Sequence, residues 1–162
     1  MTLDFTRNRV VEVEPTDDGG LSVHWRLKDS LLEAEIRMKV RVPDLEIVEA
    51  EARLGRYPYE LCAAAPELVK KTLGVRVSQG LRKIVGGLVG GADGCSELTE
   101  GVLECCNAVI LHYTLPQIRA GERLTEEQQL EARRALLQSN PRMAGSCIAF
   151  APDSPLMKEL GL

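Results

Sequence analysis

Apolar and polar residues alternate along the first third of the chain, which is the pattern of β-strands with one buried face. From Asn8 to Leu54 this alternation predicts an antiparallel sheet of three to four strands. The alternating stretches cover residues 9–14, 21–28, 36–42 and 48–54.

Turn residues separate these stretches. Asp17-Asp18-Gly19-Gly20 follows the first stretch, and Pro43-Asp44 reverses the chain before the last one. On either side of Pro43-Asp44, basic residues of one strand lie beside acidic residues of the next, so cross-strand attraction supports antiparallel pairing. We interpret this charged surface as a solvated face of the sheet.

After Leu54 the hydrophobic period becomes helical. The predicted helices cover residues 66–73, 78–88, 96 to about 114, and 125–138. The last helix begins with a capping box of Thr125 and Gln128, and Asn140-Pro141 ends it. The segment from Ala144 to Ala151 is expected to form a short strand or an extended piece over the core.

Strands followed by helices indicate an α+β fold in which the helices pack on one face of the sheet. We expect a single domain over residues 1–162, because no change of composition divides the chain. It comprises the antiparallel sheet at 1–54, a helical part at 55–140 and a C-terminal tail at 141–162.

Composition and charge narrow the possible partners. With 44% apolar and 27% charged residues, the chain has the composition of a soluble globular protein. A net charge of -4 disfavours nucleic acid as a partner. No segment has the apolar length of a membrane span or of a signal-peptide core, so we expect a cytoplasmic protein without membrane contact. The oligomeric state is left open, since no heptad or symmetric motif marks an interface.

Five cysteines, an odd number, are typical of free thiols, metal ligands or redox centres in a cytoplasmic protein. Cys62 follows the last hairpin in a loop, and Cys95 stands at the predicted start of the long helix after Gly94. Unpaired backbone N–H groups at a helix start favour the negatively charged thiolate. These two residues therefore suggest sulfur or metal chemistry.

The other conspicuous features have structural explanations. Cys105 and His112 lie on one apolar stripe of the long helix, and their spacing suits core packing better than ligation of one metal. Cys106 is likewise expected in the core. The glycine run GGLVGGADG lacks the preceding strand and the lysine of a phosphate-binding loop, so we interpret it as a flexible connector that leaves Cys95 accessible.

Two stretches resemble the bacterial domain family DUF2889, whose members have no established activity. They are RYPYELCAAAPELVKKTLGVRVSQGLRKIVGGLVGGADGCSELTE and the terminal SCIAFAPDSPLMKE. In the usual family pattern the glycine-cysteine pair precedes histidine-leucine, whereas this chain has Glu97-Leu98. A role for that histidine is therefore absent here.

A more distant resemblance is to iron-sulfur scaffold proteins of the NifU and IscU type, and it implies a NifU/SufE-like fold. The hairpin KVRVPDLEIVEAEARL precedes a loop cysteine, and CSELTEGVLECCNAVI resembles the helix that follows the second scaffold cysteine. On this resemblance Cys62 and Cys95 match two of the family's three cysteines. The implied cofactor is an iron-sulfur cluster, iron or zinc, or a persulfide.

This chain departs from the scaffold pattern at the remaining ligand positions. The scaffolds carry their third cysteine before the hairpin, where this chain has Leu31, Leu32 and Glu33, and Gly94 replaces their histidine. Because a cluster requires about four soft ligands, other donors would be needed. The candidates are Cys147 as a third thiolate and Glu33 or Glu35 as an oxygen ligand.

Three functions are compatible with these residues. The first is a sulfur- or metal-handling scaffold that uses Cys62, Cys95 and Cys147 and exchanges its cargo with a sulfur donor or recipient protein. The second is a non-catalytic binding or adaptor domain that keeps the fold without a cluster. The third is a thiol enzyme, which the absence of an obvious Cys-His pair disfavours, since His24 is expected on the wet face of a strand.

Overall fold

The computed structural model describes residues 4–139 and 141–161. The chain divides into two compact units, Met1–His112 and Tyr113–Leu162. The division falls inside the continuous helix α3 (Ser96–Gly121), which contributes to both units. The expected single domain stays a prediction, and each unit is described by itself.

The first unit contains a four-stranded antiparallel sheet in which neighbours in sequence are neighbours in space. This confirms the predicted sheet, and each strand extends beyond its alternating stretch at one end or both. The strands are β1 (Arg7–Pro15), β2 (Leu21–Asp29), β3 (Glu33–Arg41) and β4 (Glu46–Arg56). The predicted turn after β1 is closed by the Thr16 N–H, which donates to the Gly20 carbonyl at 3.0 Å.

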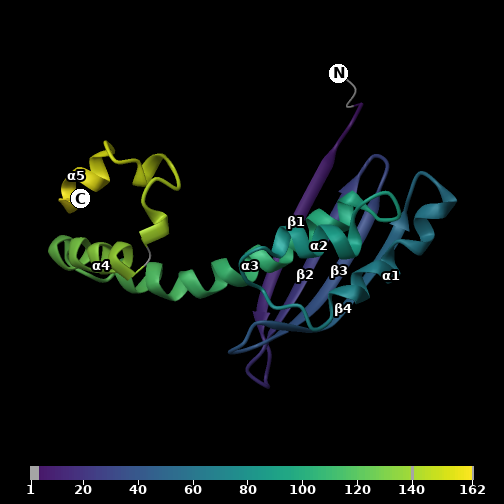
Figure 1. Ribbon diagram of the computed structural model, residues 1–162, viewed down its shortest axis with the longest axis horizontal. Coiled ribbons are helices and arrows are strands. Elements are labelled where there is room, and N and C mark those ends of the chain that lie inside the picture. The colour runs from purple at the N-terminus through teal and green to yellow at the C-terminus, as the bar shows by residue number, and fades with distance from the viewer. Residues whose placement is uncertain (1–3, 140, 162) are drawn as a thin grey trace. The chain divides into compact units, whose positions relative to one another are not determined.

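Helices cover one face of this sheet, so the fold class is α+β as predicted (Figure 1). The helical segments of the first unit are η1 (Glu60–Ala64), α1 (Pro66–Val69), η2 (Lys70–Thr72), α2 (Leu81–Val89) and the first part of α3. Gly74 ends the predicted 66–73 segment with a φ of 81°, a conformation that favours glycine. None of the described helices has the length and apolar character of a membrane span.

The core lies between the sheet and these helices. Alternation buries every second side chain of β2 and β3, while the residues between them face solvent. The sheet contributes Leu21, Val23, Trp25, Leu27, Ala34, Ile36, Met38, Val40 and Ile47, and the helices contribute Val69, Val85, Val89, Leu98, Val102, Cys105, Cys106 and Val109.

Helix α3 approaches the sheet most closely at Gly101. A Cβ atom at this position would lie 2.7 Å from the Ile36 Cδ1 atom and 3.0 Å from the Trp25 ring. The fully buried Trp25 donates its indole N–H to Glu104, one turn further along the same helix. Glycine therefore allows the close contact, and the Trp25–Glu104 hydrogen bond satisfies the polar atom that this contact buries.

Asp29 holds one end of the sheet together. Its buried carboxylate accepts hydrogen bonds from the Leu31 N–H at 2.7 Å, the Leu32 N–H at 2.6 Å and the Arg7 Nε at 2.8 Å. Its carbonyl accepts a hydrogen bond from Arg56 at the end of β4. Burial alone raises the pKa of Asp29, but the hydrogen bonds from Leu32, Leu31 and Arg7 outweigh burial and keep the pKa below its ordinary value.

The second unit is helical and has a small core of its own. It contains α4 (Glu126–Ser139), η3 (Pro141–Met143), η4 (Ile148–Phe150) and α5 (Pro155–Leu160) after the end of α3. The Thr125 N–H donates to the Gln128 side chain, and the Gln128 N–H donates to Thr125 Oγ1, which confirms the predicted capping box. Leu137, Met157 and Leu160 are buried together.

Two predictions, for the end of the long helix and for the segment at 144–151, were wrong, and a third falls partly outside the described residues. Helix α3 continues through Pro116 to Gly121 instead of ending near Thr114, because one proline removes only one N–H from the helical ladder. The expected strand or extended piece at 144–151 is instead a turn and the 3-10 helix η4, closed by the Gly145 N–H on the Phe150 carbonyl at 2.8 Å. Asn140, expected to end α4, lies outside the described residues.

Replacing Gly101 tests the close approach of α3 to the sheet. We expect Gly101→Ala to lower the free energy of unfolding by about 1–3 kcal/mol, because the added methyl group overpacks against Trp25 and Ile36. Gly86→Ala in α2 is the matched control, since nothing lies within 4 Å of its Cβ position, and it should gain about 0.5–1 kcal/mol. Urea denaturation measures both, and equal effects would contradict the contact.

Removing the charge of Asp29 tests its role at the sheet end. Near neutral pH we expect Asp29→Asn to lower the free energy of unfolding by about 2–3 kcal/mol, because Arg7 loses a buried anionic partner and meets an amide instead. The loss stays moderate because Arg7 is about a third exposed and keeps its ion pair with Glu97. Asp44→Asn, which removes a surface ion pair with Arg41, should cost clearly less than Asp29→Asn, because solvent screens that pair.

The effect of Asp29→Asn should also depend on pH. Because the folded-state pKa of Asp29 is lowered, its stabilisation is complete above the ordinary carboxyl pKa of about 4 and is lost as pH falls through the lower folded value. The difference in unfolding free energy between wild type and Asp29→Asn should therefore shrink on acidification below about pH 4. A difference that stays constant with pH would refute this assignment.

Candidate functional site

Cys62 lies in the short 3-10 helix η1 that follows β4. Its N–H donates to the Tyr59 carbonyl at 2.9 Å, and its carbonyl accepts the Ala65 N–H at 3.0 Å. Pro66 then begins α1. The Cys62 side chain is a free thiol and is half-buried. Solvent can therefore reach this thiol, which lies after the last strand as the sequence predicted.

Cys95 directly precedes α3, as the sequence predicted. Its carbonyl accepts the Thr99 N–H at 2.9 Å and the Thr99 Oγ1 at 2.8 Å, which are the contacts of the first helical turn. Its own N–H donates to the Val89 carbonyl at 2.8 Å, which ties the start of α3 to the end of α2. The half-buried side chain packs partly against the core of the first unit.

The glycine run before Cys95 is a compact turn, not the flexible connector that the sequence suggested. A Cβ atom on Gly94 would lie 2.3 Å from the carbonyl oxygens of both Val89 and Gly90, which no side chain tolerates. A Cβ atom on Gly90 would lie 2.8 Å from the Gly86 carbonyl oxygen. Glycines are therefore needed where the end of α2 and the start of α3 meet, which fixes the backbone of Cys95.

Cys62 and Cys95 belong to the same end of the sheet. Strand β4 ends at Arg56 beside the start of β3, and η1 with Cys62 follows from there. Glu97, two residues after Cys95, forms an ion pair with Arg7 at the start of β1 at 2.9 Å. The ends of β2 and β4 and the starts of β1 and β3 lie at this same end of the sheet. The topology therefore brings both thiols to one end of the first unit.

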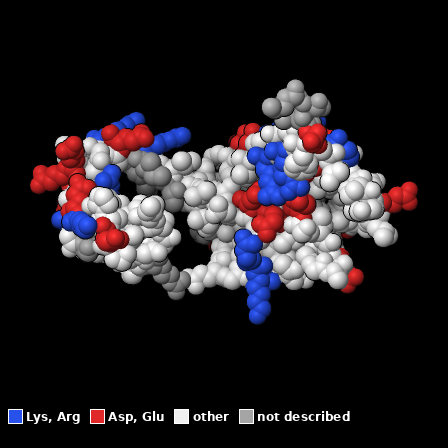
Figure 2. Space-filling model, turned by 90° about the horizontal axis from the view of Figure 1, so that it is seen from above, with Lys and Arg blue, Asp and Glu red and all other residues white. Residues whose placement is uncertain are grey.

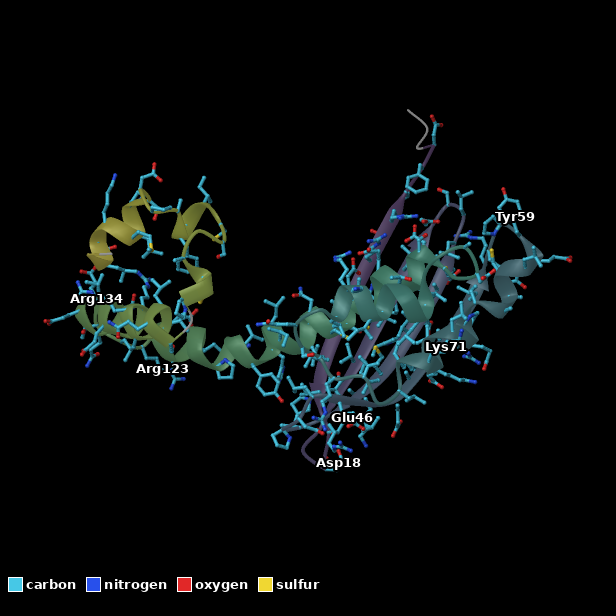
Figure 3. All side chains as sticks on the ribbon, viewed as in Figure 1. Asp18, Glu46, Tyr59, Lys71, Arg123 and Arg134 are labelled. Carbon is cyan, nitrogen blue, oxygen red and sulfur yellow. The ribbon has the colours of Figure 1, made fainter. Side chains whose placement is uncertain are left out.

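Exposed apolar side chains gather at that end. Figure 3 shows Tyr59 at the end of the sheet opposite to Asp18 and Glu46. Tyr59 is 73% exposed and Leu61, the neighbour of Cys62, is 91% exposed. The other exposed apolar residues from the segments that meet here are Phe5, Leu31 and Tyr57. Tyrosine and other large apolar side chains in such positions are typical of protein interfaces.

The remaining residues of the predicted stripe on α3 are structural. Cys105 and Cys106 are buried as predicted. Burial strongly raises the pKa of Cys105 and raises the pKa of Cys106 to about 12, so both stay protonated thiols near neutral pH. His112 is half-buried rather than fully buried, because α3 leaves the first unit at this residue.

Cys147 belongs to the second unit and is exposed. Its sulfur accepts backbone hydrogen bonds from Phe150 and Ala149, which lower the pKa of the thiol. Cys147 is therefore an exposed thiol with a pKa below its ordinary value. Its participation with Cys62 and Cys95 stays a prediction.

The oxygen donors suggested from the sequence already have cationic partners. Glu33 Oε1 lies 3.5 Å from Lys28 Nζ. Glu35 Oε2 lies 3.5 Å from His24 Nε2 and 3.9 Å from Arg37 Nη2. Within the described residues, no three His, Cys, Asp or Glu side chains are arranged to hold a metal ion.

Sequence reasoning missed a shallow pocket on the solvent-facing side of the sheet. Glu12, Glu14, Ser22, His24 and Arg37 line it, from three neighbouring strands. The Nε2 atom of His24 is shielded from solvent and lacks a hydrogen-bond partner among the described atoms. Alternation correctly placed Ser22, His24 and Arg37 on the wet face, but a pocket needs the register between strands, which the sequence pattern does not contain.

Charges of opposite sign lie side by side on the surface. In Figure 2, lysine and arginine side chains of the first unit directly adjoin aspartate and glutamate side chains. The ion pairs of Arg9 with Glu97 at 2.9 Å and with Glu104 at 3.1 Å are examples. On this face, ion pairs thus set opposite charges next to one another.

Comparison with known proteins identifies the family. The model of the family described as "Protein of unknown function (DUF2889)" matches residues 5–111, which nearly coincide with the first unit. No curated protein and no solved structure shows a significant match to the chain. Because residues 5–111 make up more than half of the 162 residues, this protein belongs to the DUF2889 family.

Proposed function

We propose that this protein is an accessory protein that carries sulfur on the thiols of Cys62 and Cys95. The observation that carries the proposal is that both half-buried thiols belong to the same end of the sheet. The same two residues match the cysteines of the NifU and IscU scaffolds, which adds a resemblance in position. Free thiols of this kind persist in a reducing compartment, which fits a cytoplasmic location.

The chemistry is a transfer of sulfane sulfur between thiols. A thiolate of this protein attacks the outer sulfur of a persulfide on a donor protein, and a new S–S bond forms as the donor's S–S bond breaks. The donor leaves as a thiolate, and this protein then carries the persulfide to a recipient by the same exchange. No oxidant is required, because the sulfane sulfur keeps its oxidation state.

Sulfur transfer fits the described donors better than a metal cluster does. A cluster needs about four soft ligands, and the sheet end supplies two thiols. Glu33 lies beside Lys28 and Glu35 lies beside Arg37, both on the solvent-facing side of the sheet. We therefore derive no step that passes through an iron-sulfur cluster, iron or zinc.

The exposed side chains around Cys62 support a docking role for the same surface. Tyr59 and Leu61 would contact the sulfur donor or recipient and bring its persulfide to the thiols. They also support a second candidate function, a binding domain without sulfur chemistry. The thiols distinguish the two, because a pure binding domain does not need Cys62 and Cys95 to react together.

Counting reactive thiols tests the accessibility that the proposal requires. In the native protein we expect Cys147, Cys62 and Cys95 to react with an aromatic disulfide reagent, with Cys147 the fastest because it is exposed and its pKa is lowered. Cys105 and Cys106 should react only after unfolding, because burial keeps them protonated. Native protein in which only Cys147 reacts would contradict the proposal.

Sulfur transfer itself is tested in a Cys147→Ser background, which removes the exposed thiol. After treatment with a low-molecular-weight persulfide, intact-mass analysis should show one added sulfur, which Cys62→Ser and Cys95→Ser together abolish. Phenylarsine oxide, which bridges two neighbouring thiols, should bind the background protein one to one and lose this affinity at least tenfold in either single variant.

Unchanged folding of these variants, followed by urea denaturation, is the control. Arsenical affinity that is the same in both single variants and in the background protein would mean that the thiols do not act as a pair. Persulfide that persists in the double variant would place the chemistry elsewhere. Either result would leave the binding domain as the better supported function.

A further inference from the structure

The two edge strands of the sheet, β1 and β4, differ in whether another segment forms hydrogen bonds with their outer side. At the β4 edge, the segment after η2 adds backbone hydrogen bonds, with the Ile47 N–H donating to Val75 and the Val77 N–H donating to Leu45, both at 2.9 Å. Strand β1 has β2 as its one neighbour in the described part of the chain. Eight of its nine residues are exposed, and its pairing with β2 runs without a bulge from Arg7 to Pro15.

The hydrogen bonds that flank β1 show which of its backbone groups point outward. The Ser30 N–H donates to the Thr6 carbonyl at 3.2 Å, and the Thr16 N–H donates to the Gly20 carbonyl at 3.0 Å. Both pairs continue the β1–β2 register, and hydrogen-bonded residues alternate along an antiparallel pair. The even-numbered residues of β1 therefore bond to β2. The N–H and C=O groups of the odd-numbered residues point away from the sheet, and these residues are Arg7, Arg9, Val11 and Val13.

A long, straight and open edge of this kind is usually protected by unpaired charges. Here the charges are neutralised within the same chain, because Arg9 pairs with Glu97 and Glu104 and Glu12 pairs with Arg26 at 2.7 Å. The centre of the strand is apolar instead. Val10 on the solvent side is 45% exposed and Val11 on the helix side is 39% exposed.

We propose that a second copy of this chain pairs with β1 in antiparallel orientation about Val11, which joins the two sheets into one. In this register Val11 lies opposite Val11 of the second copy, Arg9 opposite its Val13 and Arg7 opposite its Pro15. All of these are odd-numbered positions, so outward N–H groups meet outward carbonyl groups. Pro15, which has no N–H, falls at the end of the new ladder, where a proline is tolerated.

The order of residues along β1 favours a second copy over an unrelated strand. The strand reads Arg-Asn-Arg, then Val-Val, then Glu-Val-Glu. Antiparallel self-pairing about Val11 joins the two apolar centres, while the Arg7 and Arg9 side chains stay on the helix side, apart from Glu12 and Glu14 on the solvent side. On the solvent side the Asn8 amide lies opposite Glu14 of the second copy and can donate a hydrogen bond to its carboxylate.

The test uses the full chain and introduces a charge at Val11, the residue that lies opposite Val11 of the second copy. Sedimentation velocity over a range of concentrations should show a monomer–dimer equilibrium for wild type. Val11→Lys and Val11→Glu should each weaken the dimer at least tenfold, because like charges meet at the two-fold axis. An equimolar mixture of the two variants should recover the dimer, since lysine then lies opposite glutamate.

Leu73→Lys is the matched control, because Leu73 is an exposed apolar residue away from β1, and it should leave the dimer unchanged. A wild-type chain that stays monomeric overturns the proposal and leaves the edge to another partner. So does a dimer that Val11→Lys and Val11→Glu do not weaken. If the mixture recovers the dimer, both variants are folded. If both variants weaken the dimer and their mixture does not restore it, pairing about Val11 is wrong.

Discussion

The close contact of α3 with the sheet at Gly101 sets where this helix, and Cys95 before it, lie in the first unit. Because no side chain intervenes there, the helix comes close enough for Glu104 to reach the indole N–H of Trp25 in the core. Glu97, one turn before Gly101, then meets Arg7 and Arg9 on β1. Cys95 precedes Glu97, so the helix contact also fixes the cysteine at the end of the sheet.

A buried ionic group completes that sheet end. Asp29 joins the β2–β3 turn, the start of β1 and the end of β4 through hydrogen bonds from Leu31, Leu32, Arg7 and, at its carbonyl, Arg56. The chain continues from Arg56 into the segment that carries Cys62. The connection to Cys62 thus starts at a residue held by a charge-assisted hydrogen bond, and Cys95 is followed two residues later by Glu97, which forms an ion pair with Arg7.

The sequence predicted those parts of the structure that depend on neighbours along the chain. Alternation identified the sheet because one face of each central strand is buried, and the capping box at Thr125 identified the start of α4 because its hydrogen bonds are local. The helix α5 was missed, although Ser154 as its N-cap followed by Pro155 is a recognisable local signal.

Features that depend on contacts between distant segments could not be predicted from the pattern of apolar and polar residues. Gly94 suggested flexibility in the sequence, yet it is held rigid because the carbonyl of Val89 approaches it from the end of α2. The sequence pattern did not single out Asp29, and only the packing of Arg7 against it shows that its carboxylate is buried. The sequence suggested Cys62 and Cys95 as candidates by local position, but their location at one sheet end follows from the strand order.

The family match covers the first unit and ends close to its boundary. The match ends at residue 111, next to the boundary of the first unit at His112. Cys62, Cys95 and the edge strand β1 all lie inside the matched region, whereas Cys147 lies outside it. A function common to the family therefore has to be carried by the sheet and the helices on it. Cys147 lies in the terminal stretch that the family model does not cover, so a role in sulfur exchange has to be tested for it apart from Cys62 and Cys95.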